Sequence, residues 1–189
     1  MNVVIIAGVE TIRYPNGRVK KYSDTFLDNS ETWRHENPGV NLVILDARKY
    51  IKRENPIEAI WKAVFDSFPV LDKLIYFGHS STESLICFSH VRTELSVEER
   101  YFRSGFHYIA PWSKDAEIVI LGCQAGGQQG KKWSTSIAQI IADKIQHTVY
   151  AYVSKSYQKE GPKGHYHQVS DDKIGLVKFL PESKIDELK

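Results

Sequence analysis

Short apolar runs rich in β-branched residues recur along this chain, and a small or polar residue closes most of them. Runs of this kind are typical of strands that are buried on both faces, as in a parallel sheet. Five such strands are predicted, at residues 3–7, 41–47, 73–77, 118–121 and 148–153. Apolar residues at helical spacing predict helices between them, at about 23–34, from Pro56 with Asn55 as N-cap, and at 134–146. This alternation predicts an α/β fold of three layers, α/β/α, in which helices cover both faces of a mainly parallel sheet.

The other segments carry weaker patterns. Residues 9–40 are polar and mixed apart from the helix near 23–34, and residues 84–88 suit a strand or a hairpin arm. Residues 89–115 are interpreted as irregular, the polar tail from Ser154 as loop, and residues 174–180 as a last strand. The 189 residues suit a single domain, 1–189, with one core.

Composition narrows the classes of function. Apolar residues make up 42% of the chain, which is typical of a folded protein, and the net charge of +2 without a long basic block argues against nucleic acid as a partner. The N-terminus lacks the basic segment of a signal peptide, and no apolar run approaches the roughly 20 residues that cross a bilayer. We therefore predict a cytoplasmic protein with no membrane partner, two reduced cysteines (Cys87 and Cys123), no cofactor and no metal site.

Two of the predicted strands end in the same way. The run to Phe77 continues as Gly78-His79-Ser80, and the run to Leu121 continues as Gly122-Cys123, so that a titratable side chain follows a small residue in both. Ligands of open α/β sheets bind at the carboxyl ends of the strands. If the two strands are parallel neighbours, His79 and Cys123 meet at that edge.

A cysteine and a histidine at one site suggest nucleophilic catalysis. The thiolate is the reactive form of cysteine, and a free thiol, with a pKa of about 8.5, is mostly protonated at neutral pH. A nearby imidazole can accept the thiol proton and later protonate the leaving group. Backbone N–H groups in the glycine-rich turns would stabilise the oxyanion, and the candidate donors are those of Ser80, Cys123 and Gln124.

Other interpretations of the same residues stay open. Gly78-His79-Ser80-Ser81-Thr82 is similar to the nucleophile elbow of a serine α/β-hydrolase, with Ser80 as nucleophile, although Thr82 replaces the last glycine. Its acid and histidine would come from Asp143 and from His147 or His165. Alternatively, His79 and Cys123 are structural residues, and the protein is a non-enzymatic interaction module.

The blocks Leu74-Ile75-Tyr76-Phe77-Gly78-His79-Ser80 and Ile118-Val119-Ile120-Leu121-Gly122-Cys123 resemble the caspase-like (clan CD) cysteine peptidases, which include caspases, gingipains, separases and legumains. His79 and Cys123 are 44 residues apart, compared with about 50 in caspases. The resemblance covers residues 1–155 and is nearest to small bacterial members. Ser80 stands where glycine is commoner, and Gln124-Ala125-Gly126 differs from the caspase Cys-Arg-Gly type.

The resemblance implies a caspase-hemoglobinase fold and a cysteine endopeptidase that acts on a peptide or protein substrate. It implies Cys123 as the nucleophile and His79 as the base or proton donor. It also implies that the loop after the fifth strand, Ser154, Lys155, Ser156 and Tyr157, lines the pocket for the residue before the scissile bond. An inactive relative of the family would keep this fold without the chemistry.

Overall fold

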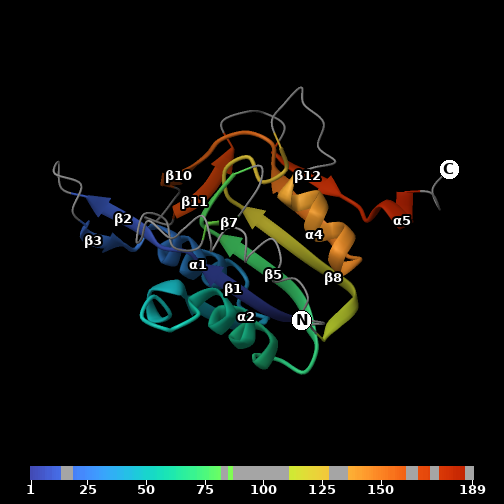
Figure 1. The fold of residues 1–189 in the computed structure, drawn as a ribbon, viewed down its shortest axis with the longest axis horizontal. Helices are drawn as coiled ribbons and strands as arrows, with labels where there is room; N and C mark the ends of the chain where they lie inside the picture. The colour runs from blue at the N-terminus through green and yellow to red at the C-terminus, as the bar shows by residue number, and fades with distance from the viewer. Residues whose placement is uncertain are drawn as a thin grey trace.

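The fold is built on a six-stranded, mostly parallel sheet (Figure 1). The computed structural model describes residues 1–13, 19–81, 85–86, 111–127, 136–160, 166–170 and 175–185. The strand order is β12-β9-β8-β5-β1-β4. The strands are β1 (Asn2–Ala7), β4 (Asn41–Asp46), β5 (Leu71–Phe77), β8 (Trp112–Leu121), β9 (Thr148–Tyr152) and β12 (Leu176–Phe179). All neighbours pair in parallel except β12, which is antiparallel to β9.

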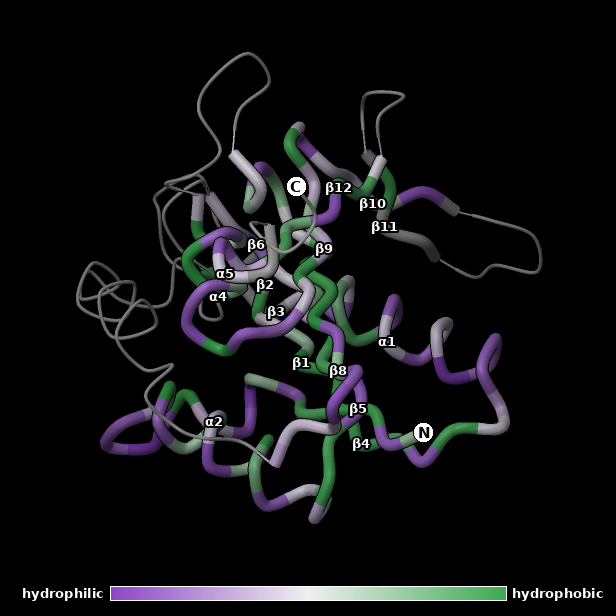
Figure 2. The backbone as a smooth tube through the Cα atoms, turned by 90° about the vertical axis from the view of Figure 1, so that its right-hand side faces the viewer, coloured by the Kyte–Doolittle hydropathy of each residue, from purple (hydrophilic) through white to green (hydrophobic). Residues whose placement is uncertain are grey.

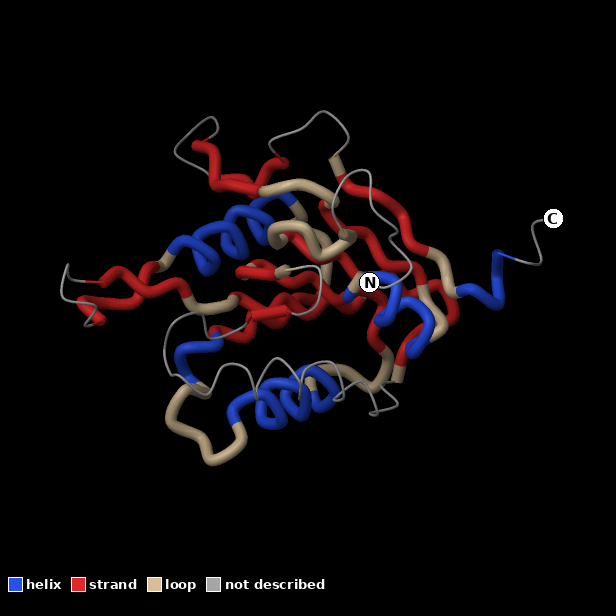
Figure 3. Tube along the Cα trace, turned by 45° about the horizontal axis from the view of Figure 1, so that its top comes forward, coloured by secondary structure: helices blue, strands red, loops and turns tan. Residues whose placement is uncertain are grey.

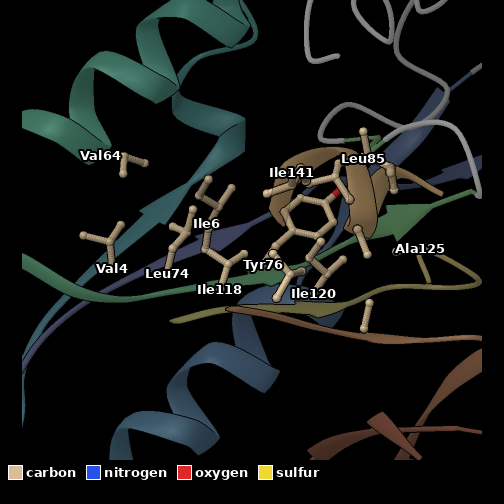
Figure 4. Close-up of a cluster of buried hydrophobic side chains, with 14 of the residues drawn as sticks. Val4, Ile6, Val64, Leu74, Tyr76, Leu85, Ile118, Ile120, Ala125 and Ile141 are labelled. Carbon is tan, nitrogen blue, oxygen red and sulfur yellow. The ribbon is translucent and has the colours of Figure 1, made fainter. Parts of the chain in front are cut away.

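Helices lie on both faces of the sheet (Figures 2 and 3). They are α1 (Thr25–Glu36), α2 (Pro56–Asp66) and α4 (Ile137–Ile145), with the short η1 (Ala47–Lys49) and α5 (Glu182–Ile185). Val4 and Ile6 of β1 belong to a buried cluster with α2 and α4, whereas Val3 and Ile5 pack with Phe26 of α1 (Figure 4 shows part of the larger cluster). Because successive strand residues point to opposite faces, an uninterrupted apolar strand serves both clusters.

None of the helices in the described ranges is long and apolar enough to cross a bilayer. Helices α1, α2 and α4 each bury part of their surface. In α4 the N-cap is Ser136, whose hydroxyl accepts a hydrogen bond from the Gln139 N–H at 3.2 Å. In α2 the prediction is confirmed: Asn55 is the N-cap and the helix begins at Pro56, although the Asn55 side chain makes no capping hydrogen bond.

All five predicted strands are confirmed, as are the three helices and the last strand, within a few residues of the expected limits. Of the segment 84–88, the described residues 85–86 form β7, which pairs antiparallel with β6 (His79–Ser80). Residues 134–135 and 89–110 lie outside the described residues.

Three segments were predicted wrongly. Residues 112–115 were expected to be irregular, but they begin β8. The tail after Ser154 was expected to be a loop, but it forms a hairpin of β10 (Ser156–Glu160) and β11 (Tyr166–Ser170). In the segment interpreted as polar and mixed, β2 (Glu10–Arg13) pairs with β3 (Val19–Ser23). These strands stand outside the six-stranded sheet or, for 112–115, at its margin. Their sequences contain few apolar residues, so they lack the apolar runs from which the other strands were recognised.

An ion-pair network joins the carboxyl end of β4 to the start of α1. The Arg48 guanidinium donates to both carboxylate oxygens of Asp46 at 2.8–3.0 Å and to the Asp24 carboxylate at the N-cap of α1. Burial acts to raise the pKa of Asp46, but the hydrogen bonds and charge of Arg48 outweigh it and lower that pKa. Burial and the charge of Asp24 instead raise the pKa of Asp28, against the opposing effect of Arg48.

We expect Asp46→Asn to reduce the free energy of unfolding at pH 7 by about 1–3 kcal/mol, because Arg48 loses charge-assisted hydrogen bonds. A carboxyl whose pKa is lowered on folding stabilises the protein above its unfolded pKa of about 3.9, and this contribution is lost as the pH falls through the folded pKa. The difference between wild type and variant should therefore shrink below about pH 4. Urea unfolding between pH 7 and pH 3 measures it. Asp66→Asn, which removes an exposed ion pair with Lys62, is the control and should lower the free energy of unfolding by less than about 0.5 kcal/mol. If the difference in stability between wild type and Asp46→Asn does not change with pH, the role of Asp46 is contradicted.

Candidate functional site

The sheet brings the two predicted strand ends together. β5 and β8 are parallel neighbours, and Phe77 is paired with Leu121 at the last position of their ladder. His79 and Cys123 each follow two residues later, so they occupy equivalent positions just beyond the carboxyl ends of strands that lie about 4.8 Å apart. Both residues are partly exposed. The sequence prediction required the two strands to be parallel neighbours, and β5 and β8 meet that requirement.

On the histidine side, neighbouring aromatic residues hold the main chain and the ring. The Tyr76 hydroxyl donates a hydrogen bond to the His79 carbonyl at 2.7 Å. The ring of Phe26, which is almost fully buried on α1, meets the imidazole edge to face with centroids 5.2 Å apart. A Cβ at Gly78 would lie 2.3 Å from the Tyr76 hydroxyl oxygen, so this position suits glycine.

On the cysteine side, Ser80 ties the two strand ends to each other. Its hydroxyl donates to the Cys123 carbonyl at 2.8 Å. A Cβ at Gly122 would lie 2.2 Å from that hydroxyl oxygen and 2.7 Å from the Gly78 carbonyl oxygen, so glycine allows the close approach of the two strand ends. The chain then turns at Gln124, whose φ of 54° lies in the left-handed region.

This arrangement counts against Ser80 as a hydrolase nucleophile, because its hydroxyl is engaged with a main-chain carbonyl. The proposed triad partners also lie elsewhere. His147 precedes β9 and contacts Trp112 at the start of β8, which places it at the amino ends of the strands, opposite Ser80. Asp143 accepts hydrogen bonds from Gln139 and from the Glu182 N–H, and His165 lies outside the described residues.

The sulfur of Cys123 meets Ser156, the first residue of β10. The thiol donates to the Ser156 carbonyl at 3.4 Å, the Ser156 N–H donates to the sulfur at 3.4 Å, and the Ser156 hydroxyl lies 3.5 Å from it. Among the residues that the structure describes, these contacts account for every hydrogen bond of the sulfur. The thiol proton is therefore directed at a carbonyl in this structure.

The three candidate oxyanion donors differ in their surroundings. The Gln124 N–H donates to the Ser154 carbonyl at 2.8 Å and is occupied in this conformation. Ser80 lies in the short ladder of β6 and β7, paired with Leu85. The N–H of Cys123 has no hydrogen-bond acceptor among the described residues and is the donor best placed to bind an oxyanion beside the sulfur.

The four residues implied as a substrate-binding loop lie beside this site. Ser154 and Ser156 contact the cysteine turn, while Lys155 and Tyr157 are exposed, Tyr157 by 51%. Just before them, burial raises the pKa of Tyr152, so its hydroxyl stays protonated through the neutral range. Within the described ranges, no group of three or more His, Cys, Asp and Glu side chains could hold a metal ion.

Two contacts of the site were not foreseen from the sequence. The contact of Phe26 with the His79 ring depends on how α1 packs against the sheet. The contact of Ser156 with the sulfur depends on the path of the chain from β9 into β10, and no local pattern reports it.

No family model matches the chain, and no similar curated protein was found. The geometry at the two strand ends is therefore what bears on function.

Proposed function

We propose that this protein is a cysteine endopeptidase of the caspase-like type, with a Cys123–His79 dyad. The observation that supports it most directly is the equivalent placement of the two residues beyond the carboxyl ends of adjacent parallel strands. The arrangement of α1 on one face of the sheet and α2 and α4 on the other agrees with a three-layer caspase-hemoglobinase-like domain. The proposed substrate is a peptide or protein, and the chemistry requires no cofactor.

In the proposed reaction, the imidazole of His79 accepts the thiol proton and the Cys123 sulfur attacks the carbonyl carbon of the scissile peptide bond. The oxyanion that forms is bound by the N–H of Cys123. His79 then protonates the leaving amine, the C–N bond breaks, and a thioester remains. Water attacks the thioester with His79 as base, which releases the acid and restores the thiol.

The exposed residues Lys155 and Tyr157 fit a role in binding substrate, because they belong to the segment whose Ser156 touches the nucleophile. The side chains here are polar or aromatic, and none supplies a buried charge for the residue before the scissile bond.

Labelling with electrophiles tests the assignment directly. Incubation with a peptidyl acyloxymethyl ketone library at pH 7.5 should modify Cys123 faster than Cys87, and a peptide library should yield cleavage products that prior alkylation removes. Mass spectrometry identifies both the modified residue and the cut sites.

The other candidates predict different results. Modification of Ser80 by a fluorophosphonate would support the serine hydrolase. Equal, slow labelling of both cysteines with no cleaved peptide would support an inactive interaction module, an alternative favoured by the engagement of the sulfur with Ser156. Either result would contradict the cysteine peptidase.

A further inference from the structure

The segment that follows β9 runs along the cysteine turn and forms several hydrogen bonds with it. The Gly126 N–H donates to the Tyr152 carbonyl at 2.9 Å, and the Gln124 N–H donates to the Ser154 carbonyl at 2.8 Å. The next contact along this path is that of Ser156 with the Cys123 sulfur. Carbonyls of alternate residues, 152 and 154, thus bind the turn, and residue 156 reaches the nucleophile.

Ser156 occupies the space that a substrate needs. Its carbonyl oxygen and amide nitrogen both lie 3.4 Å from the sulfur. A scissile carbonyl carbon has to approach the sulfur to about 3–3.5 Å before attack, so a substrate and the Ser156 main chain compete for the same side of the sulfur.

The hydrogen bonds of this segment also work against the proposed reaction. The Ser156 carbonyl accepts the thiol proton, which the proposed reaction transfers to His79. The Ser154 carbonyl at the same time occupies the N–H of Gln124, one of the candidate oxyanion donors.

We propose that Ser154, Lys155 and Ser156 form a latch that holds Cys123 in a resting state, and that the latch must leave the sulfur before a substrate can react. This inference rests on the proposed function, because it assigns regulation to the same cysteine. The latch continues into β10, whose partner β11 packs against α1, the helix that carries Phe26 beside His79 (Figure 1). Movement of the hairpin would therefore change the contacts of Cys123 directly and those of His79 through α1.

A cross-linking experiment tests whether Ser156 meets the sulfur in solution. In Ser156→Cys, treatment of the folded protein with diamide, which takes up the two hydrogens of the thiols, should form a disulfide to Cys123. The matched control is Ser154→Cys. In the wild type the Ser154 hydroxyl donates to the Lys155 carbonyl, so a cysteine at this position should form a disulfide with Cys123 at least about tenfold more slowly. Mass spectrometry of the digested protein locates the linkage, and absence of a faster cross-link in Ser156→Cys would overturn the latch.

An alkylation experiment tests whether the contact restrains reactivity. Ser156→Ala removes the hydroxyl at 3.5 Å from the sulfur, and the rate at which iodoacetamide modifies Cys123 should rise by about two- to tenfold, as expected for the loss of one hydrogen bond from the closed state. Ser67→Ala removes a comparable hydroxyl at the C-cap of α2 and should leave this rate unchanged. An unchanged or slower rate in Ser156→Ala would overturn the latch, since a hydroxyl that stabilised the thiolate would give the slower rate.

The two proposals fail separately. If the cross-link forms and alkylation accelerates but no variant cleaves a peptide, the latch stands and the peptidase does not. If peptides are cleaved at Cys123 but the substitutions at Ser156 have neither effect, the peptidase stands and the latch is wrong.

Discussion

Cys123→Ala is expected to abolish peptide hydrolysis, on the order of a 10⁴-fold loss or more, while the protein stays folded. The thiol of Cys123 lies beside a backbone N–H that has no acceptor among the described residues, whereas the hydroxyl of Ser80 is engaged with the Cys123 carbonyl. The side chain is partly exposed and contacts Ser156 at 3.4–3.5 Å, so its removal should change the free energy of unfolding by less than about 1 kcal/mol. Cleavage of a fluorogenic peptide selected from the library measures the activity, and urea unfolding measures the stability.

His79→Ala is the companion variant for this prediction. It should lose about 10²–10⁴ in rate, less than Cys123→Ala, because the nucleophile remains and only proton transfer is impaired. Both variants should unfold near the wild-type urea midpoint, so their losses of activity can be attributed to catalysis and not to unfolding. A Cys123→Ala protein that cleaves the peptide at the wild-type rate would show that the nucleophile lies elsewhere in the chain.

The strands that position the dyad could be predicted because burial leaves a signature in the sequence. Ile118–Leu121 and Leu74–Phe77 are apolar at every position since both faces of the central strands are covered, by α1 on one side and by α2 and α4 on the other. A glycine and a titratable residue after each run then marked the strand end. The parallel pairing of β5 and β8 brings these two ends to one edge of the sheet. The local sequences do not show which strands are neighbours, so this pairing could only be assumed.

The hairpin of β10 and β11 could not be predicted in this way. Its strands are largely polar, as in Ser156–Glu160, and they lie outside the main sheet, so no apolar run or clean alternation marks them. The contact between Ser156 and the sulfur follows from where this hairpin leaves β9. It joins residues 33 positions apart, and neither of their local sequences indicates the contact.

Gly122→Ala is expected to destabilise the protein by about 2–4 kcal/mol and to lower peptidase activity by about 10²-fold. The added Cβ would lie 2.2 Å from the Ser80 hydroxyl oxygen and 2.7 Å from the Gly78 carbonyl oxygen, so the two strand ends have to separate. Overpacking of this kind costs about 1–3 kcal/mol, and the loss of the hydrogen bond from Ser80 to the Cys123 carbonyl adds about 1 kcal/mol. Displacement of the sulfur from the imidazole by about 1 Å accounts for the loss of rate.

A double-mutant cycle shows whether this steric contact is the cause. Ser80→Gly in the Gly122→Ala background removes the atoms at 2.2 and 2.9 Å but leaves the Gly78 carbonyl, so it should restore part of the stability, with a coupling of about 1–2 kcal/mol. Gly39→Ala is the matched control, because a Cβ there meets nothing within 4 Å, and it should change the stability by less than about 0.5 kcal/mol. Additive effects of the two substitutions would mean that Ser80 and Gly122 do not hold the strand ends together, and the geometry of the dyad would then depend on the turn at Gln124 and on Phe26.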